Sequence, residues 1–492
     1  MKHFFLSVLF ICFFIGSSAR DSLFTKQHHD AFDLITSLRF IEAEELITDI
    51  KRTDKDDITV ILLENYIDAI SIFISEDEGL FNKQKHKKNQ RLERLKRINN
   101  DSPLNLYTEA EILLQWAVAR IKFGEYVTAA LEVNRAIKLL NKNKMKYPGF
   151  VYNHKSLSLL HAISGTIPRP FKSIVSTISN FEGTIQQGID EIDSVLEFSE
   201  NNEYLYKNEA IIIKTILLQN LENNPDKAYI FFKSKDLDVV NNPLLSYIMA
   251  NVAQRSGRND EAISILEKRG HDPRSFPFYY LDYFLGNLKL SKGDNDANIY
   301  LKSYLKNFKG RNYIKETYRK LAWYELIINQ DEKAYTAEIS KCLSEGFDIM
   351  DEDKAARKEA RSGIIPDHEL LKARILFDGS YFGEALYVID QIQIERLDKN
   401  KLIEYYYRKG RILEKLDQNE LALETFQSCI NSGSGSKAYY ICNSHILRGN
   451  IFEFQKKYPK ARKEYKAALR TNPSEYQRSL HQKAKAGLIR IK

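Results

Sequence analysis

Two short stretches of the sequence hold the residue types that bind metal ions. His28, His29 and Asp30 stand side by side, and the run 348–353 contains four carboxylates. Two histidines share one face of a helix when they are three or four residues apart, whereas adjacent ones diverge. The acidic run lacks the glycine and the distal glutamate of a calcium loop. We therefore expect no metal site. The histidines should lie in a frayed segment near the start of the mature chain, and the acidic run should be a solvated connection.

The sequence also lacks the motifs that carry common catalytic chemistry. It contains no phosphate-binding glycine loop with Lys-Ser or Lys-Thr, no Gly-x-Ser-x-Gly and no His-Glu-x-x-His. We therefore expect no catalytic residues, no cofactor and no enzymatic activity.

The segment 83–97 is strongly basic, with eight lysines and arginines and the single acid Glu93. Such a run can contact nucleic acid or an acidic surface. However, it has no interleaved aromatic residues, and the net charge of the 492-residue chain is only +7. These facts favour a solvated linker or helix face, and we expect no nucleic-acid partner.

The N-terminus has the three parts of a secretory signal peptide. Lys2 and His3 precede an apolar run, 4–15, and the small residues 16–19 end at Ala19. We expect cleavage after Ala19 and export to the periplasm or beyond, which is compatible with an association with the cell envelope. No later segment approaches the length of apolar residues that a membrane-spanning helix needs, so no integral span is expected.

Export would leave three cysteines in the mature chain, Cys342, Cys429 and Cys442. An odd number is a poor basis for a disulfide framework. A bridge between Cys429 and Cys442 is geometrically conceivable, and the alternative is that Cys429 packs as a small apolar residue.

Pairs of small residues, about twelve apart, recur through the C-terminal half. Their first members are separated by 36 to 39 residues, apart from one step of 51. The pairs are Ala250/Ala262, Gly286/Ala297, Ala322/Ala334, Ala373/Ala385, Gly410/Ala422 and Gly449/Ala461. A period of this length is typical of a helix-turn-helix unit, in which small residues let the two helices cross closely. Because one unit cannot bury its apolar face alone, the pattern predicts an all-α solenoid of stacked repeats.

These residues resemble the tetratricopeptide repeat (TPR) family, which has small and bulky residues at fixed positions. One segment matches at Gly449, Phe452, Ala461, Tyr465, Ala468 and Pro473, another at Tyr406, Gly410, Leu413, Ala422, Phe426 and Cys429, and an earlier one at Ala117, Gly124, Tyr126, Ala129, Val133 and Ala136. A weaker resemblance, over about 110–340, is to tetratricopeptide repeat protein 39 and its inclusion-body-clearance relatives. It depends on the turn 165–171 and on Gly183 and Gly188.

The predicted organisation has four parts. A signal peptide, 1–19, is followed by an N-terminal helical region, 20–160, with one repeat at about 110–142. An irregular helical region, 161–240, leads to an array of about six repeats over 243–492.

The TPR resemblance implies that the first helix of each repeat lines a concave groove, through the residue three before its small residue and the one after it. These positions give the candidate partner-binding residues Tyr247, Asn251, Tyr283, Asn287, Tyr407, Arg411 and Asn450. Asparagine can both donate to and accept from a peptide backbone, and tyrosine offers a flat contact surface. That some of these side chains instead face neighbouring helices stays open.

Together these features predict an exported, non-catalytic scaffold or adaptor that binds another protein or peptide. The alternative is a carbohydrate- or nutrient-binding protein of the outer cell surface, where aromatic side chains would stack on sugars.

Overall fold

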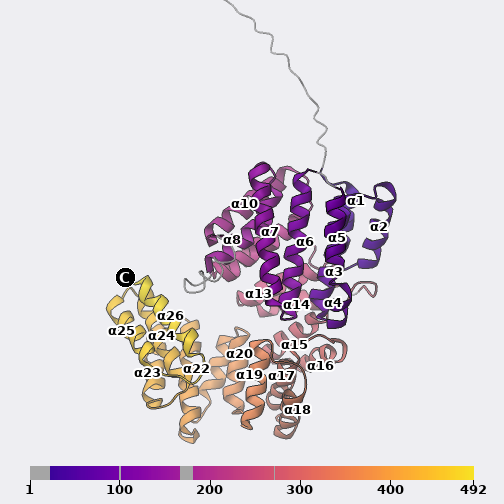
Figure 1. The fold of residues 1–492 in the computed structure, drawn as a ribbon. Coiled ribbons are helices and arrows are strands. Elements are labelled where there is room, and N and C mark those ends of the chain that lie inside the picture. The colour runs from indigo at the N-terminus through magenta and orange to yellow at the C-terminus, as the bar shows by residue number, and fades with distance from the viewer. Residues whose placement is uncertain (1–22, 99–100, 167–180, 271, 492) are drawn as a thin grey trace, which may run out of the picture.

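The computed structural model describes residues 23–98, 101–166, 181–270 and 272–491. Every regular element in these ranges is a helix, and the helices follow one another as antiparallel hairpins in a winding array (Figure 1). The all-α repeat fold predicted from the sequence is thus confirmed. The predicted signal peptide, Cys12 and most of the turn 165–171 lie outside the described residues.

Seven helices form the N-terminal part, and Figure 1 shows them at the opposite end of the molecule from the C-terminus. They are α1 (Lys26–Thr36), α2 (Phe40–Thr53), α3 (Ile58–Ser75), α4 (Glu78–Gln84), α5 (Lys87–Ile98), α6 (Pro103–Lys122) and α7 (Tyr126–Lys146). The α6–α7 hairpin contains the early repeat predicted at about 110–142. Its small residues Ala117 and Ala129 are both buried.

Helix α3 is the most apolar helix of this part and packs against α1, α2, α5 and α6. By length and composition alone it could cross a membrane, because its 18 residues have a mean hydropathy of 1.6. The expectation that no segment after the N-terminal run reaches that length is therefore wrong. However, 78% of these residues are buried inside the protein. A helix at the centre of a core has this same composition.

The middle region contains two close helix contacts that need glycine. Its elements are α8 (Tyr152–Thr166), α10 (Ile185–Asn201), α11 (Lys207–Ile216), a π-helical turn (Leu217–Leu221) and α12 (Pro225–Lys233). A Cβ at Gly188 would lie 2.3 Å from the carbonyl oxygen of Ser158, and one at Gly183 would lie 2.5 Å from the Cα of His161. The two glycines therefore allow α10 and the residues before it to approach α8 closely.

Six helix hairpins follow within the described residues 243–491. Their helices are α13 (Pro243–Arg255) with α14 (Asn259–Glu267), α15 (Tyr280–Lys292) with α16 (Ala297–Asn307), α17 (Ile314–Ile327) with α18 (Glu332–Ser344), α20 (His368–Asp378) with α21 (Phe382–Asp390), α22 (Lys399–Lys415) with α23 (Asn419–Ser432), and α24 (Tyr439–Phe454) with α25 (Tyr458–Arg470). Helix α19 (Asp351–Ser362) is inserted before α20, and α26 (Gln477–Arg490) packs on α24 and α25.

The recurring small residues lie where the two helices of a hairpin touch. A Cβ at Gly286 would lie 2.8 Å from Leu301, and one at Gly410 would lie 2.6 Å from the ring of Phe426. At Gly449 the corresponding distance to Tyr465 is 2.5 Å. These distances are shorter than normal carbon–carbon contacts, so a larger residue would force the hairpins apart.

The acidic run 348–353 is only in part the solvated connection that the sequence suggested, because Asp351 and Glu352 are exposed but Asp353 is not. Helix α19 begins within it, and Asp353 is fully buried. One oxygen of its carboxylate accepts a hydrogen bond from the backbone N–H of Tyr313 (2.8 Å), and the other accepts from that of Glu316 (3.0 Å). Asp353 therefore caps the N-terminus of α17 from the inserted helix, which is favourable because helix N-termini carry unpaired N–H groups.

The array also makes contacts between segments that are far apart in sequence. The backbone N–H of Phe276 donates to the carbonyl oxygen of Leu38 (2.7 Å), and the rings of Phe276 and Phe40 lie 5.2 Å apart. The loop before α15 is thus fixed to the start of α2. The N-terminal helices pack onto the central repeats and do not extend away from them.

Candidate functional site

Five of the seven candidate partner-binding residues are partly exposed on the first helices of their repeats. They are Tyr247, Asn251, Asn287, Arg411 and Asn450. The other two are buried: Tyr283 is 4% exposed and Tyr407 is 3% exposed. The prediction that these two tyrosines line an open groove is therefore wrong. They fill the contacts between neighbouring helices.

The burial of Tyr283 has a direct cause in its surroundings. Its ring lies 5.4 Å from that of Tyr304 on α16 and 5.0 Å from that of Tyr313 at the start of α17. Tyr407 is covered in the same way by Tyr440 of the next repeat, at 4.7 Å. First helices inside the array have neighbours on several sides, so a tyrosine there can face either a groove or another helix.

Tyr280, three residues before Tyr283, is partly exposed. Its ring lies 5.7 Å from Tyr247 on the preceding repeat and 5.5 Å from Tyr313 on the following one. Tyr247, Tyr280 and Tyr313 thus form an aromatic ladder across three consecutive repeats. Burial raises the pKa of all three hydroxyls above the ordinary value, so they stay neutral hydrogen-bonding groups at physiological pH.

The three candidate asparagines differ in whether their side-chain oxygens have hydrogen-bond partners. The side-chain oxygen of Asn251 accepts from Gln219 Nε2 (2.8 Å), and that of Asn450 accepts from the Tyr465 hydroxyl (2.8 Å). The buried amide oxygen of Asn287 has no hydrogen-bond partner among the described residues. An unpaired buried acceptor is uncommon in native structures, and Asn287 lies on the same helix as Tyr280 of the ladder.

Arginines join successive repeats farther along the array. The guanidinium of Arg374 lies 4.7 Å from the ring of Trp323, and that of Arg411 lies 4.2 Å from the ring of Phe377. Each arginine follows the small residue of its own first helix and covers an aromatic ring of the preceding one. Cation–π contacts of this kind fix the side chain and leave fewer donors for a partner.

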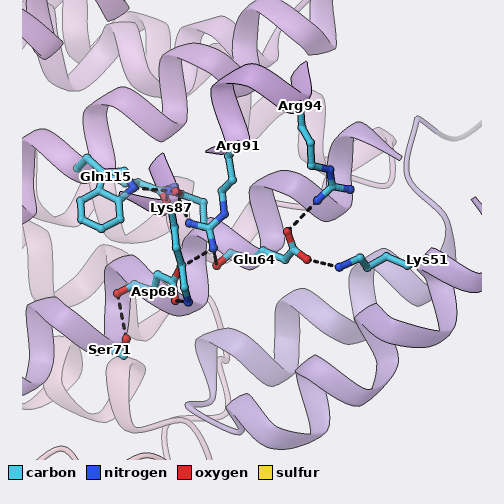
Figure 2. Close-up of polar contacts among 10 residues, drawn as sticks. Lys51, Glu64, Asp68, Ser71, Lys87, Arg91, Arg94 and Gln115 are labelled. Carbon is cyan, nitrogen blue, oxygen red and sulfur yellow. Dashed lines mark hydrogen bonds and ion pairs between the residues drawn. The ribbon is translucent and has the colours of Figure 1, made fainter. Parts of the chain in front are cut away.

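The basic segment 83–97 forms parts of α4 and α5, and its charges are largely paired within the protein (Figure 2). Lys87 and Arg91 converge on Asp68 of α3, and Lys87 lies 2.9 Å from that carboxylate. Glu64, one turn earlier on α3, lies between Lys51 (2.6 Å) and Arg94 (3.2 Å). The expectation of a solvated linker or helix face is wrong for this part of the segment.

Arg91 is the most buried cation of this group, with 7% of its surface exposed. Its guanidinium also donates to the side-chain oxygen of Asn65 (3.0 Å), which in turn accepts from Trp116 Nε1 (2.9 Å). A cleft of about 440 Å³ lies beside these residues between α2, α3 and α5. Because acids and bases alternate along its walls, the cleft has no strong preference for one sign of charge.

Lys155 of α8 is a buried amine that could suggest covalent chemistry. It is 1% exposed, and its Nζ lies 2.8 Å from Glu111 and 2.9 Å from Glu209. Burial by itself would lower the pKa of Lys155, but the two carboxylates outweigh it and raise the pKa above the ordinary value. The amine therefore stays protonated and acts as a structural cation, not as a nucleophile.

His28 is part of the packed N-terminal region and is not in a frayed segment. It is 4% exposed, and its Nε2 lies 2.9 Å from a carboxylate oxygen of Asp57, which caps α3. In the described part of the chain, no three His, Cys, Asp or Glu side chains are placed so that they could hold a metal ion.

All three cysteines of the described chain are buried free thiols. Cys429 and Cys442 donate weakly to the carbonyl oxygens of Ile403 and Ala468, each at 3.5 Å. Both pack as small residues between the helices of their hairpins, and the Cys429–Cys442 bridge does not form in this structure.

Comparison with known proteins identifies the repeat. Residues 403–432, which cover most of α22 and α23, match the family model of the tetratricopeptide repeat. The protein is therefore an all-α protein of helix-turn-helix repeats, with a tetratricopeptide repeat in its C-terminal half.

Solved structures that are similar to the chain include the following two. One is described as the structure of Naa15/Naa10 bound to HypK-THB; it is 13% identical, with 94% of this chain and 65% of that chain covered and a TM-score of 0.28. The other is the TPR domain of P58(IPK), which is 15% identical, with 84% of this chain and 97% of that chain covered and a TM-score of 0.23. None of the curated proteins compared with the chain matches it.

Proposed function

We propose that this protein is a non-catalytic scaffold that binds a segment of another protein across the first helices of its central repeats. The aromatic ladder Tyr247–Tyr280–Tyr313 would supply the contact area, and Asn251 and Asn287 would hold the backbone of the bound segment. The observation that carries this proposal is the partly exposed tyrosine ladder across three consecutive repeats, with the partly exposed Asn287 two helical turns after Tyr280 on α15.

The chemistry of these side chains suits an extended peptide. A peptide backbone presents N–H and C=O groups at regular intervals, and an asparagine amide can pair with both. Asn251 and Asn287 are partly exposed, so their side chains are accessible to such a backbone. Tyrosines held by neighbouring rings lose little conformational entropy when a partner covers them.

We also propose that the protein acts outside the cytoplasm, after removal of residues 1–19. The motif at Lys2–Ala19 supports this proposal. In addition, Phe24, near the start of the described residues, is 1% exposed against Tyr152 and Tyr206. A mature chain that begins at Arg20 would keep this packed residue. N-terminal sequencing of the purified protein tests this; a chain that retains Met1 would contradict it.

Affinity capture with matched variants tests the scaffold function. We expect Tyr280→Ala combined with Asn287→Ala to abolish capture of the partner protein and to leave helicity unchanged. The control is Ile299→Ala with Tyr387→Ala, because these side chains are 63% and 70% exposed on second helices. Equal capture by both variants would overturn the assignment of the surface. Binding of glycans but of no protein would favour the carbohydrate-binding alternative.

A further inference from the structure

The C-terminal end of the array has a large excess of basic over acidic residues. Residues 437–491 contain 13 lysines and arginines but only three acids, Glu453, Glu464 and Glu475. Because the whole chain has a net charge of only +7, the rest of it is net acidic. The basic charge is therefore concentrated on the last described hairpin and on α26.

The acids of this region are already engaged, which leaves the exposed cations uncompensated. Glu464 is buried and pairs with His445 and Arg448 (3.0 Å). Glu453 pairs with Arg490 (2.7 Å), and Glu475 pairs with Lys358 on α19. Among the described residues, no carboxylate lies within ion-pair distance of six other exposed cations here. They are Lys456, Lys463, Lys466, Arg470, Lys483 and Lys485.

Three of these cations form a row along α25. Ala461, Tyr465 and Ala468 face the core and are fully buried. Lys463, Lys466 and Arg470 are exposed and follow one another at spacings of three and four residues. Residues with this spacing lie on one face of a helix. The row therefore points outward from the hairpin, and its charges do not converge on a pocket.

Large apolar side chains are also exposed near the ends of two helices of this basic region. Phe454 at the end of α24 is 82% exposed, and Ile489 near the end of α26 is 67% exposed. The pair Glu453–Arg490 joins these two helix ends, so the two apolar residues, each next to a member of the pair, lie at the same end of the domain. Exposed apolar groups beside lysines are typical of surfaces that insert shallowly into a membrane interface.

We propose that this surface, defined by α25, α26 and Phe454, docks the protein onto an anionic lipid bilayer. Lysines act as point charges that need no fixed partner geometry, which suits mobile phosphate headgroups. Phe454 and Ile489 would enter the boundary between headgroups and acyl chains. A nucleic acid would pair with the exposed cations but would offer no apolar environment to Phe454 and Ile489. A lipid surface accommodates both the cations and the apolar side chains.

Vesicle flotation tests this inference with the full mature chain. The probes are vesicles of phosphatidylcholine with 30% phosphatidylglycerol, and vesicles of phosphatidylcholine alone, at low and high salt. We expect binding only to the anionic vesicles and a loss at high salt, because the attraction is screened. The variant Lys463→Glu/Lys466→Glu/Arg470→Glu should bind at least tenfold more weakly, since each basic residue contributes to the attraction.

Two further variants separate charge placement from total charge and from folding. Lys302→Glu/Lys306→Glu/Lys333→Glu makes the same change of charge on exposed positions of α16 and α18, and should bind as the wild type does. Phe454→Ser/Ile489→Ser keeps every cation and should weaken binding at high anionic lipid content. Circular dichroism confirms that each variant is folded.

Three outcomes would overturn the proposal. They are no binding of the wild type to anionic vesicles, an equal loss in both triple charge variants, and binding of a DNA duplex or of polyglutamate without binding of vesicles. The last result would assign the basic surface to a nucleic acid or to an acidic protein. A loss of partner capture together with normal vesicle binding would leave this inference intact, so its failure and that of the scaffold function are distinguishable.

Discussion

Glu76, at the end of α3, accepts two hydrogen bonds from Asn312, which is 236 residues later in the chain. The backbone N–H of Asn312 lies 3.0 Å from one carboxylate oxygen and its side-chain nitrogen lies 2.8 Å from the other. Glu76 is 6% exposed and also pairs with Lys122 (2.5 Å). This contact holds the central helix of the N-terminal region against the loop that begins α17.

Removal of Glu76 should therefore destabilise the contact between two parts of the array. Glu76→Ala leaves the partly exposed Lys122 ammonium and the N–H groups of Asn312 without this acceptor, and we expect a loss of about 2–4 kcal/mol in the free energy of unfolding. Hydrogen exchange should quicken in α3 and near residue 312. Glu78→Ala is the control, because Glu78 is exposed and lies 3.9 Å from Arg311. Equal effects of both variants would show that the contact contributes little.

Asp353 should make stability depend on pH. Burial raises its pKa from 3.8 to about 6, against the backbone hydrogen bonds from Glu316 and Tyr313, which lower it. The folded state thus binds the proton of Asp353 more tightly than the unfolded chain does. The stabilisation that results from this proton binding is complete below pH 4 and is lost as the pH rises through 6. Relative to Asp353→Asn, which does not titrate, the wild type should lose about 3 kcal/mol between pH 4 and pH 7. Denaturant unfolding at both pH values measures this difference, and a constant difference would contradict it.

Larger residues at the contacts between the two helices of a hairpin should destabilise the protein. Ala461 is fully buried on α25, and Tyr465 already lies too close to Gly449 to admit a Cβ there. We expect Ala461→Leu to cost about 1–3 kcal/mol through overpacking. Since each repeat contacts mainly its neighbours, the loss of hydrogen-exchange protection should be confined to about residues 410–491. Unchanged protection there would show that Ala461 is not at the crossing.

The thiols should be unreactive until the protein unfolds. Burial raises the pKa of Cys342 to about 12 and that of Cys429 to about 11, so little thiolate is present at pH 8. We expect no reaction of the native protein with a thiol reagent and three reactive thiols per mature chain in denaturant. One reactive thiol would indicate a Cys429–Cys442 bridge, and four would indicate that Cys12 and the signal segment are retained.

The repeat fold could be predicted from the sequence because its cause is local. Close crossing of two helices needs a small residue on the contact face, and this need recurs along the array, for example at Gly286, Gly410 and Gly449. The spacing of these small residues along the sequence therefore predicts the stacked helix hairpins directly. The buried free cysteines have the same explanation, since Cys429 stands at a position that favours a small residue.

The site could be predicted only in part, because helix phase and long-range packing decide exposure. Tyr280 and Tyr283 lie on the same helix and both contact Tyr313, but Tyr283 also packs against Tyr304 of α16 and is the buried one. Asp353 and Glu76 act on backbone groups far away in sequence, and no local pattern marks such roles. The basic surface of α25 and α26 had a signal in the sequence, which a count of charge along the chain would have revealed.

The central claim, that a protein partner binds on the first helices, can be tested by photo-crosslinking from single positions. A photoreactive phenylalanine analogue at Asn287 should form a covalent adduct with the partner, because Asn287 is partly exposed and lies two helical turns after Tyr280 of the ladder on α15. The same analogue at Tyr387, 70% exposed on a second helix, should form none. An adduct from position 387 and none from position 287, with the partner still captured, would contradict the account.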